Sequence, residues 1–515
     1  MKRIVLLGAS NSIVQKGLSK GLKDTLMSCG GGGGWGGGGG GPPPPPPPEF
    51  HNLALGGSRS SQKIYSLITN KKVIEEADLI IIETNLNEYD NFVYDLHFDI
   101  LQRDFEILCK MLANLNKPIL FILLPLHVND DKFKITNNFN LLQIKKYNFH
   151  FIDMQRYYDE NNLNEFFATN DLFHQIGPIM RLLGQNIALN LGKIGKCNLK
   201  RNYPVPKFLA VTLQDLFENI NQLEKSVKSN SLFTEELYRL EGKIKLKFKK
   251  KFKNYMLVAF SVWNDDNGLG TFSSAIWTNK KTKIIKYCLS SFLMMYNLIE
   301  NFVIDEESFL YFNANNQKQS ENNLWIFLKD DCCNALDCMQ LANQILLVKP
   351  DENFKIDAHY DFKTLANLEV QIDEKYNFSH LIPDVALFKE IIEEYNARMD
   401  PVKISPFQTE IKNLKHELNQ FKVNPIQTHL AYKLGRAIIE NYGSFWGFLG
   451  LPFVLNYIAK KHKKEANILP CDESEKQIFS YQLGLALIKA HKAWYKGGYV
   501  WFMFEIFRLK KKFKL

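Results

Sequence analysis

The sequence lacks any apolar run long enough to cross a membrane. No uninterrupted apolar segment approaches the roughly 20 residues that a transmembrane helix needs. The start, Met1 to Ala9, is similar to a secretory signal, but its apolar stretch is shorter than the ~7 to 15 residues of such a signal. We therefore expect Ile4 to Leu7 to form a first β-strand and the chain to be cytoplasmic.

Cysteine is sparse, and its spacing matches no metal site. The 8 cysteines are scattered, and Cys332, Cys333 and Cys338 lack a matching second pair or nearby histidines. This pattern argues against a zinc site and against a disulfide framework. No metal or nucleotide motif occurs, so we expect a site without a cofactor. No nucleic-acid motif accompanies the formal net charge of +9, so nucleic acid is not expected as a partner.

The composition is that of a globular protein with several domains. Hydrophobic residues make up 45% and charged residues 23% of the chain, which is ordinary for soluble proteins. At 515 residues, the chain should hold two or three domains. Its basic end, Arg508 to Leu515, has two interpretations. A solvated helical tail is the simpler one, and peripheral contact with an anionic membrane surface or an anionic glycan is the other.

Residues 28–48 form a glycine-rich and proline-rich insertion. Glycine-rich chain is flexible and a proline run is stiff and extended, so this segment cannot pack a core. It lies between the first helix and the second predicted strand, Phe50 to Leu55, at the sheet edge opposite the strand-to-helix loops. An insertion is tolerated there. An ordinary linker, an assembly error and a slipping nucleotide repeat in the gene explain it equally well.

Residues 1–195 alternate between strand and helix patterns. Continuous apolar runs indicate strands that are buried on both faces, and helical spacing separates them. This alternation predicts a three-layer α/β domain with a parallel, flavodoxin-like sheet. The further predicted strands are Leu79 to Ile82, Pro118 to Leu124 and Phe149 to Ile152, and the predicted helices include Asn91 to Leu115 and Gln175 to Leu191.

Four short motifs lie in order along this domain. Ser10 follows the first strand, at the sheet edge where α/β proteins place their chemistry and where backbone N–H groups favour negative charge. A histidine that is oriented by a carboxylate can remove the proton of the Ser10 hydroxyl, and Asp171 and His174 form such a pair. Gly57 and Asn87 can then stabilise an oxyanion. The motifs are Gly8 to Ser12, Gly56 to Ser58, Glu83 to Asn87, and Asp171 to His174.

These four motifs resemble those of the SGNH (GDSL-like) hydrolase superfamily. The resemblance implies Ser10 as nucleophile, His174 as general base and Asp171 as its orienting carboxylate. It also implies an oxyanion hole formed by the Ser10 N–H, Gly57 and Asn87. The sequence departs from the family pattern in two blocks: Ala9 replaces an acid, and Thr84-Asn85-Leu86-Asn87-Glu88 stands where Gly-x-Asn-Asp is usual. Asn85 therefore competes with Asn87 for the oxyanion role.

Each motif also has a structural interpretation. Ser10 can be a helix N-cap. Asp171 can cap the helix that follows, which leaves His174 exposed. Gly56 and Gly57 can form a turn that needs positive φ. The joint occurrence of the motifs at predicted strand ends favours the catalytic interpretation.

The rest of the chain divides into three predicted parts. Residues 196–240 are expected to be a helical linker, because Leu213 to Val227 has helical spacing. Residues 241–375 alternate as strands and predict a β-sandwich-like domain. Trp263, Trp277 and Trp325 lie in it, as core residues or as sugar-stacking platforms, with the core favoured.

Residues 383–515 are predicted to form an α-helical module. Ile411, Leu414, Leu418 and Phe421 have the spacing of a short coiled-coil seam or of a core-facing helix. Tyr432 to Ile439 and Tyr481 to Ile488 are two copies of a weak repeat, Tyr-x-Leu-Gly-x-Ala-x-Ile. This module resembles one attached to sugar transferases encoded in bacterial capsule and lipooligosaccharide loci.

Together the two resemblances imply a function in surface polysaccharide biosynthesis. An SGNH-type serine forms a covalent intermediate that water or another hydroxyl resolves. We expect transfer of an ester-linked substituent, acyl or phosphoryl-derived, to a hydroxyl of the polysaccharide or its precursor. Two alternatives stay open: a carbohydrate O-acyl esterase of the same fold, and a catalytically silent glycan-binding protein.

Overall fold

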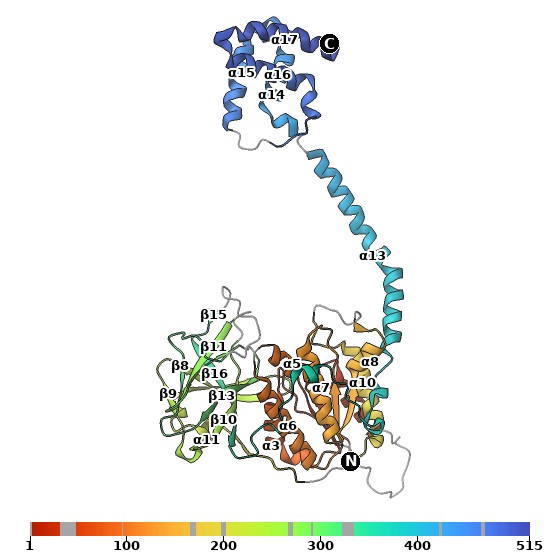
Figure 1. Cartoon of the computed structure of the whole chain (residues 1–515), viewed down its shortest axis with the longest axis vertical. Coiled ribbons are helices and arrows are strands. Elements are labelled where there is room, and N and C mark those ends of the chain that lie inside the picture. The colour runs from red at the N-terminus through yellow and green to blue at the C-terminus, as the bar shows by residue number, and fades with distance from the viewer. Residues whose placement is uncertain are drawn as a thin grey trace, which may run out of the picture. The chain divides into compact units, whose positions relative to one another are not determined.

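The computed structural model describes two compact units, Met1–Ile392 and Glu393–Leu515 (Figure 1). The greater part of the glycine- and proline-rich insertion, 31–47, lies outside the described residues, as does Trp325. The structure describes residues 3–30, 48–94, 96–164, 171–196, 202–265, 271–289, 292–321, 334–421, 425–464 and 469–515.

The first unit contains the predicted parallel sheet. Its five strands have the order β2-β1-β3-β4-β5, which is the flavodoxin-like order, and all pairs are parallel. Strands β3 and β4 are buried throughout, as their continuous apolar runs predicted. The parallel α/β fold is therefore confirmed. The strands are β1 (Arg3–Leu7), β2 (Glu49–Asn52), β3 (Leu79–Glu83), β4 (Ile119–Leu123) and β5 (His150–Asp153).

Helices cover both faces of this sheet. The core on one face includes side chains of α2 and α10, and the core on the other face includes side chains of α3 and α6. The single helix predicted for 91–115 is instead split between α5 and α6, because His97 before α6 has extended backbone angles. The helices are α1 (Ser10–Ile13), α2 (Leu18–Gly30), α3 (Ser60–Thr69), α4 (Lys71–Glu75), α5 (Asn85–Val93), α6 (Phe98–Asn114), α7 (Asp131–Lys146), α8 (Met154–Glu160) and α10 (Gly177–Leu189).

A sandwich of two mainly antiparallel sheets follows in the chain. One sheet has the order β13-β10-β16-β8-β7 with β6 paired to β16, and the other has the order β12-β11-β14-β9 with β15 beside β11. Side chains of both sheets, such as Phe260 and Trp277, share one core. The sandwich strands are β6 (Lys207–Val211), β7 (Glu224–Ser229), β8 (Thr234–Glu241), β9 (Lys245–Lys247), β10 (Met256–Val262), β11 (Thr271–Thr278), β12 (Lys283–Cys288), β13 (Met294–Val303), β14 (Phe309–Phe312), β15 (Asn334–Ala335) and β16 (Cys338–Lys349).

The stretch 196–240 is not a helical linker. It contributes β6, β7 and β8 to the sandwich, and its described α-helix is the single turn α11 (Leu213–Leu216). Within the stretch of helical spacing, Glu224 onwards forms β7, whose pairing with β8 overrides the local pattern, because strand preference depends on neighbouring strands. Trp263 and Trp277 are buried core side chains, so neither is an exposed platform for a sugar ring.

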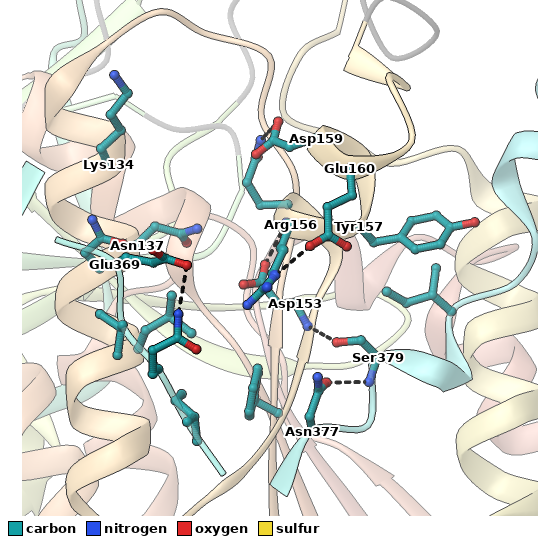
Figure 2. A pocket seen from close by; sticks show the side chains of 18 of the residues that line it. Lys134, Asn137, Asp153, Arg156, Tyr157, Asp159, Glu160, Glu369, Asn377 and Ser379 are labelled. Atoms are coloured by element: carbon teal, nitrogen blue, oxygen red, sulfur yellow. Dashed lines mark hydrogen bonds and ion pairs between the residues drawn. The ribbon is translucent and has the colours of Figure 1, made fainter. Parts of the chain in front are cut away.

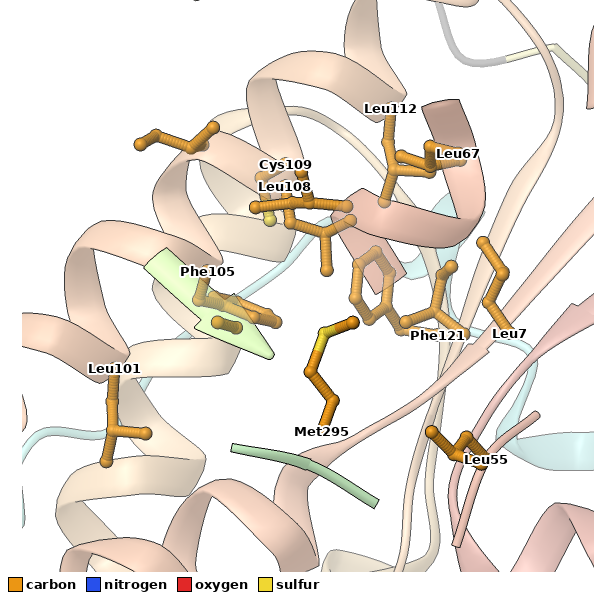
Figure 3. Close-up of a cluster of buried hydrophobic side chains, with 14 of the residues drawn as sticks. Leu7, Leu55, Leu67, Leu101, Phe105, Leu108, Cys109, Leu112, Phe121 and Met295 are labelled. Carbon is orange, nitrogen blue, oxygen red and sulfur yellow. The ribbon is translucent and has the colours of Figure 1, made fainter. Parts of the chain in front are cut away.

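The sandwich and the α/β layers share a hydrophobic core. Met295 of β13 lies among Phe105 of α6, Phe121 of β4 and Leu55 (Figure 3). Strands β10 and β16 contribute to the same cluster from the sheet face that points away from the sandwich interior. The predicted catalytic and β-rich parts are therefore one packed body.

After β16, the chain returns to the α/β layers through a segment that contains α12 (Phe362–Ala366). The Phe378 N–H donates to the Phe151 carbonyl (2.8 Å), and the Asp153 N–H donates to the Ser379 hydroxyl (3.0 Å). These bonds lie along β5, the last strand of the parallel sheet. They cover a sheet edge that would otherwise present unpaired backbone groups.

Helix α13 (Val385–Phe421) leads from the first unit into the second. Ile411 and Leu414 are exposed on it, so these two side chains do not face a core in the described residues. The side chains of Leu418 and Phe421 lie outside the description. The coiled-coil interpretation of this spacing stays a prediction. In the described part of the chain, no helix is long and apolar enough to cross a membrane.

The second unit packs the two repeat copies against each other through their glycines. A Cβ on Gly435 would lie 1.6 Å from the Ser480 carbonyl oxygen, and a Cβ on Gly484 would lie 1.7 Å from the Ala431 carbonyl oxygen. Each glycine thus lets the backbone of one helix approach the other. The helices are α14 (Leu430–Asn441), α15 (Phe445–Lys464), α16 (Phe479–Lys492) and α17 (Gly498–Phe513).

Replacing a repeat glycine should destabilise the second unit. We expect Gly484→Ala to lower the free energy of unfolding by about 1–3 kcal/mol, because the new methyl group meets backbone atoms. Gly450→Ala on α15 is the matched control: nothing lies within 4 Å of its Cβ position, so stability should be unchanged or raised. Urea unfolding followed by circular dichroism measures both, and equal effects would contradict the close helix contact.

Candidate active site

A cavity of about 690 Å³ at the carboxyl edge of the parallel sheet gathers the predicted site residues. Ser10, Gly57, Asn87, Asp171 and His174 all line it. Ser10 follows β1 and Asn87 follows β3, and the strand order reverses between these two strands. In open α/β sheets this reversal point is where ligands bind.

The turn that carries Ser10 is held by a buried carboxylate. Glu83 ends β3, and its Oε2 accepts hydrogen bonds from the Ala9 N–H (2.7 Å) and the Ser12 hydroxyl (3.0 Å). Gly8 is required here, because a Cβ would lie 2.0 Å from Ser12 Oγ. This role of Glu83 was not predicted from the sequence. In the sequence, a single acidic residue at the end of an apolar strand is the pattern that indicates such a role.

Asp171 holds His174 in two ways. Its Oδ2 lies 2.7 Å from His174 Nδ1, and its Oδ1 accepts a hydrogen bond from the His174 N–H (3.2 Å). The carboxylate therefore positions both the ring and the loop backbone. When Nδ1–H donates to Asp171, the lone pair of His174 Nε2 is available to accept a proton.

Asn11 ties the serine turn to the histidine loop. Its Nδ2 donates to the Phe173 carbonyl (2.9 Å), and its Oδ1 accepts from the Gln175 N–H (2.8 Å). Phe173 and Gln175 flank His174, so this one side chain sets the spacing between the turn of Ser10 and the loop of His174. The sequence showed Asn11 beside Ser10, but nothing in it indicated a partner so distant along the chain.

The structure separates the two candidate asparagines. Asn85 is buried, and its side chain bonds to the Leu124 N–H, the Leu124 carbonyl and Asn137, which ties the end of β3 to the end of β4. Asn87 lines the cavity and Asn85 does not. Geometry therefore favours Asn87 as the amide that faces a substrate.

The two glycines of the second motif also differ. Gly57 has a φ of 65°, a conformation that side chains disfavour. The φ of Gly56 is not positive. The atom nearest to its Cβ position lies at an ordinary contact distance of 3.4 Å. Backbone geometry therefore requires glycine at position 57.

Buried charges lie behind the cavity wall. Glu88 Oε1 accepts hydrogen bonds from the Ser60 N–H (3.0 Å) and hydroxyl (2.5 Å) at the start of α3, and burial raises the pKa of its carboxyl group. Burial lowers the pKa of Lys63, whose Nζ donates to the Ser58 hydroxyl (3.3 Å). Burial also lowers the pKa of Arg59 to about 10. Glu88 thus has a structural role at the position where the sequence departs from the family pattern.

Part of the cavity wall comes from the sandwich. Phe292 and Leu293 precede β13, and Leu232 and Phe233 lie between β7 and β8. All four are apolar and far from the four motifs in sequence. The sequence did not predict this wall, because tertiary packing brings these segments to the sheet edge.

A second cavity of about 1030 Å³ lies at the carboxyl end of β5 (Figure 2). Burial raises the pKa of Asp153 to about 6, and the Arg156 N–H donates to its Oδ1 (3.0 Å). The hydroxyl of Ser379, also in this cavity, accepts from the Asp153 N–H, so it serves to anchor the returning segment. None of the four motifs lines this cavity.

A metal centre is absent from the described residues. Among them, no group of three or more His, Cys, Asp or Glu side chains is placed to hold a metal ion. Cys332 and Cys333 lie outside the description.

A family model matches the C-terminal part of the chain. Residues 351–469 and 472–515 match the model of a domain of unknown function (DUF8374). This match covers less than half of the chain and shows no sugar-transferase relationship. No curated protein matches the sequence significantly.

Solved structures resemble part of the chain. A lipase/acylhydrolase from Enterococcus faecalis is 16% identical, with 38% of this chain and 98% of that structure covered and a TM-score of 0.30. The acetyl xylan esterase AlAXEase is 13% identical over 37% and 98%, with a TM-score of 0.28. The acetylxylan esterase Axe2 from Geobacillus stearothermophilus is 12% identical over 39% and 97%, with a TM-score of 0.29. These values are too low to assign an activity.

The two asparagines should respond differently to truncation. We expect Asn85→Ala to lower the free energy of unfolding by about 1–3 kcal/mol, because the buried Leu124 backbone groups lose their partners. Asn87→Ala is the matched control and should lower it less, because this side chain lines the cavity and does not bond the Leu124 backbone. Chemical denaturation of both variants measures this. A larger loss for Asn87→Ala would contradict the assignment.

Proposed function

We propose that the first unit is an SGNH-type serine enzyme that cleaves a carboxylic ester through an acyl-serine intermediate. One observation supports this most: a single cavity is lined by Ser10, Gly57, Asn87 and a histidine whose Nδ1 lies 2.7 Å from the Asp171 carboxylate. A nucleophile, an oriented base and oxyanion donors are the parts that acyl transfer requires.

The proposed reaction has two steps. Ser10 Oγ bonds to the ester carbonyl carbon while His174 Nε2 takes the hydroxyl proton, and Asp171 stabilises the resulting imidazolium. The Ser10 and Gly57 N–H groups and the Asn87 amide bind the oxyanion. The C–O bond to the leaving alcohol breaks, and that alcohol receives the proton. An incoming hydroxyl then attacks the acyl-serine while His174 Nε2 takes its proton; the bond between the acyl carbon and Ser10 Oγ breaks, and His174 returns the proton to Ser10.

The cavity lining favours an acyl group over a phosphoryl-derived group. Among the described residues that line it, none is Lys or Arg, and Asp90 and Asp171 are acidic. A phosphoryl group is usually met by cations. Phe292 and Leu232 instead offer apolar contact to the carbon chain of an ester.

The nature of the incoming hydroxyl decides between esterase and transferase. More specifically, we propose that the acyl group is transferred to a hydroxyl of a surface polysaccharide or its precursor. The resemblance of the C-terminal module to one attached to capsule and lipooligosaccharide transferases motivates it. Carbohydrate O-acyl esterase activity is the alternative, with water as the acceptor.

A fluorophosphonate probe tests for an activated serine. Wild-type protein should be labelled, whereas Ser10→Ala and His174→Ala should lose labelling, because one removes the nucleophile and the other the base. Ser231→Ala is the matched control, since Ser231 lines the same cavity from the β7–β8 turn and should leave labelling intact. Gel fluorescence after timed reaction gives the rates. Folded wild-type protein that does not react would point to a glycan-binding protein instead.

Product analysis separates transfer from hydrolysis. We expect a p-nitrophenyl acyl ester to yield acylated glycan when a polysaccharide acceptor is present, and less free acid, because the acceptor competes with water. Asn87→Ala should slow release of p-nitrophenol by about 10²–10³-fold through loss of an oxyanion donor. Mass spectrometry of the acceptor measures transfer. Free acid that is undiminished by acceptor would count against the transferase.

A further inference from the structure

The outward face of α17 carries an apolar stripe, which we define as Val500, Met503, Phe504 and Phe507. These side chains are between 56% and 71% exposed in the described structure. Their spacing of three and four residues places them on one face of the helix. Apolar side chains that gather in this way mark an interaction surface.

The opposite face of α17 is also apolar. Phe502, Ile506 and Leu509 pack into the core of the second unit with Leu483 of α16. A helix that is apolar all round is normally covered on both sides. In the described residues, only the inner side of α17 is covered.

Helix α15 repeats this arrangement. Leu449, Phe453 and Tyr457 are exposed at four-residue spacing, while Leu451 and Leu455 pack toward the core. Each of these helices follows one copy of the repeat along the chain: α15 follows α14, and α17 follows α16. The unit therefore presents two stripes of the same kind.

Exposed lysines continue both stripes. Lys511 lies four residues beyond Phe507 on the same face of α17, and Lys514 caps the end of this helix. Lys460, Lys461 and Lys464 lie beyond Tyr457 on the same face of α15. Each stripe thus passes from aromatic and aliphatic side chains to positive charge.

We propose that the two stripes bind the surface of an anionic lipid bilayer. Aromatic side chains enter the boundary between headgroups and acyl chains, and lysines extend to lipid phosphates. With 16 residues, α17 is too short for the roughly 20-residue span of a bilayer, so it lies in the interface rather than crossing it. The surface lies in the second unit and does not depend on the proposed catalysis.

Vesicle co-sedimentation with the full chain tests this proposal. Wild-type protein should bind vesicles of phosphatidylcholine mixed with phosphatidylglycerol, and bind less to phosphatidylcholine alone or at high salt. Phe504→Ser combined with Phe507→Ser should weaken binding at least about tenfold through lost apolar burial. Lys511→Glu combined with Lys514→Glu should weaken it by about tenfold on anionic vesicles only.

Matched controls lie in the first unit. Leu189→Ser with Val227→Ser removes side chains that are 64% and 60% exposed, and Lys280→Glu with Lys281→Glu reverses two exposed lysines. Both pairs should leave vesicle binding unchanged.

Two results would overturn the proposal. One is wild-type protein that stays unbound at low salt. The other is a concentration-dependent dimer, seen by sedimentation equilibrium, that the Phe504 and Phe507 changes abolish without affecting vesicle binding, because a second copy of the chain would then cover the stripe. Ester cleavage measured on the same samples keeps this outcome separate from failure of the catalytic proposal.

Discussion

The contact between the β-sandwich and the α/β layers is the interaction on which the candidate site depends. Met295 of β13 is inserted among Phe105, Phe121 and Leu55, so one sheet face of the sandwich shares the core of the parallel sheet. Burial of apolar side chains is the main favourable contribution to the free energy of folding. The same contact brings Phe292 to the edge of the cavity, so the site is complete only when both layers are packed.

Buried polar groups align these layers and the turn that carries Ser10. Asn297 of β13 accepts from the Ser61 hydroxyl (2.8 Å) and donates to Asp104 (3.0 Å), which links the sandwich to α3 and α6. At the end of β3, Glu83 plays the corresponding part for the Ser10 turn. A buried polar group without its partner is costly, so such bonds specify one arrangement of the layers.

The second unit is held together by the close packing of two helices. Its core is small, and close approach of α14 and α16 at Gly435 and Gly484 holds the repeat copies together. Such packing leaves the outer faces of α15 and α17 apolar. In the proposals above, the first unit supplies chemistry and the second supplies a lipid-facing surface, which would keep an ester-processing site near glycans or lipids at a membrane.

Local sequence patterns predicted the parallel sheet and the place of Ser10, because buried strands are continuous apolar runs and the Ser10 motif follows the first of them. Asp171 and His174 lie in the loop before α10, and the Asp-x-x-His pattern rather than a strand end indicated them. The same reasoning was wrong for 196–240, where pairing with β16 decides the structure. Tertiary structure alone decided that Asn87 rather than Asn85 faces the cavity. It also decided the partners of Asn11 and Glu83, because hydrogen bonds between segments distant in sequence leave no local pattern.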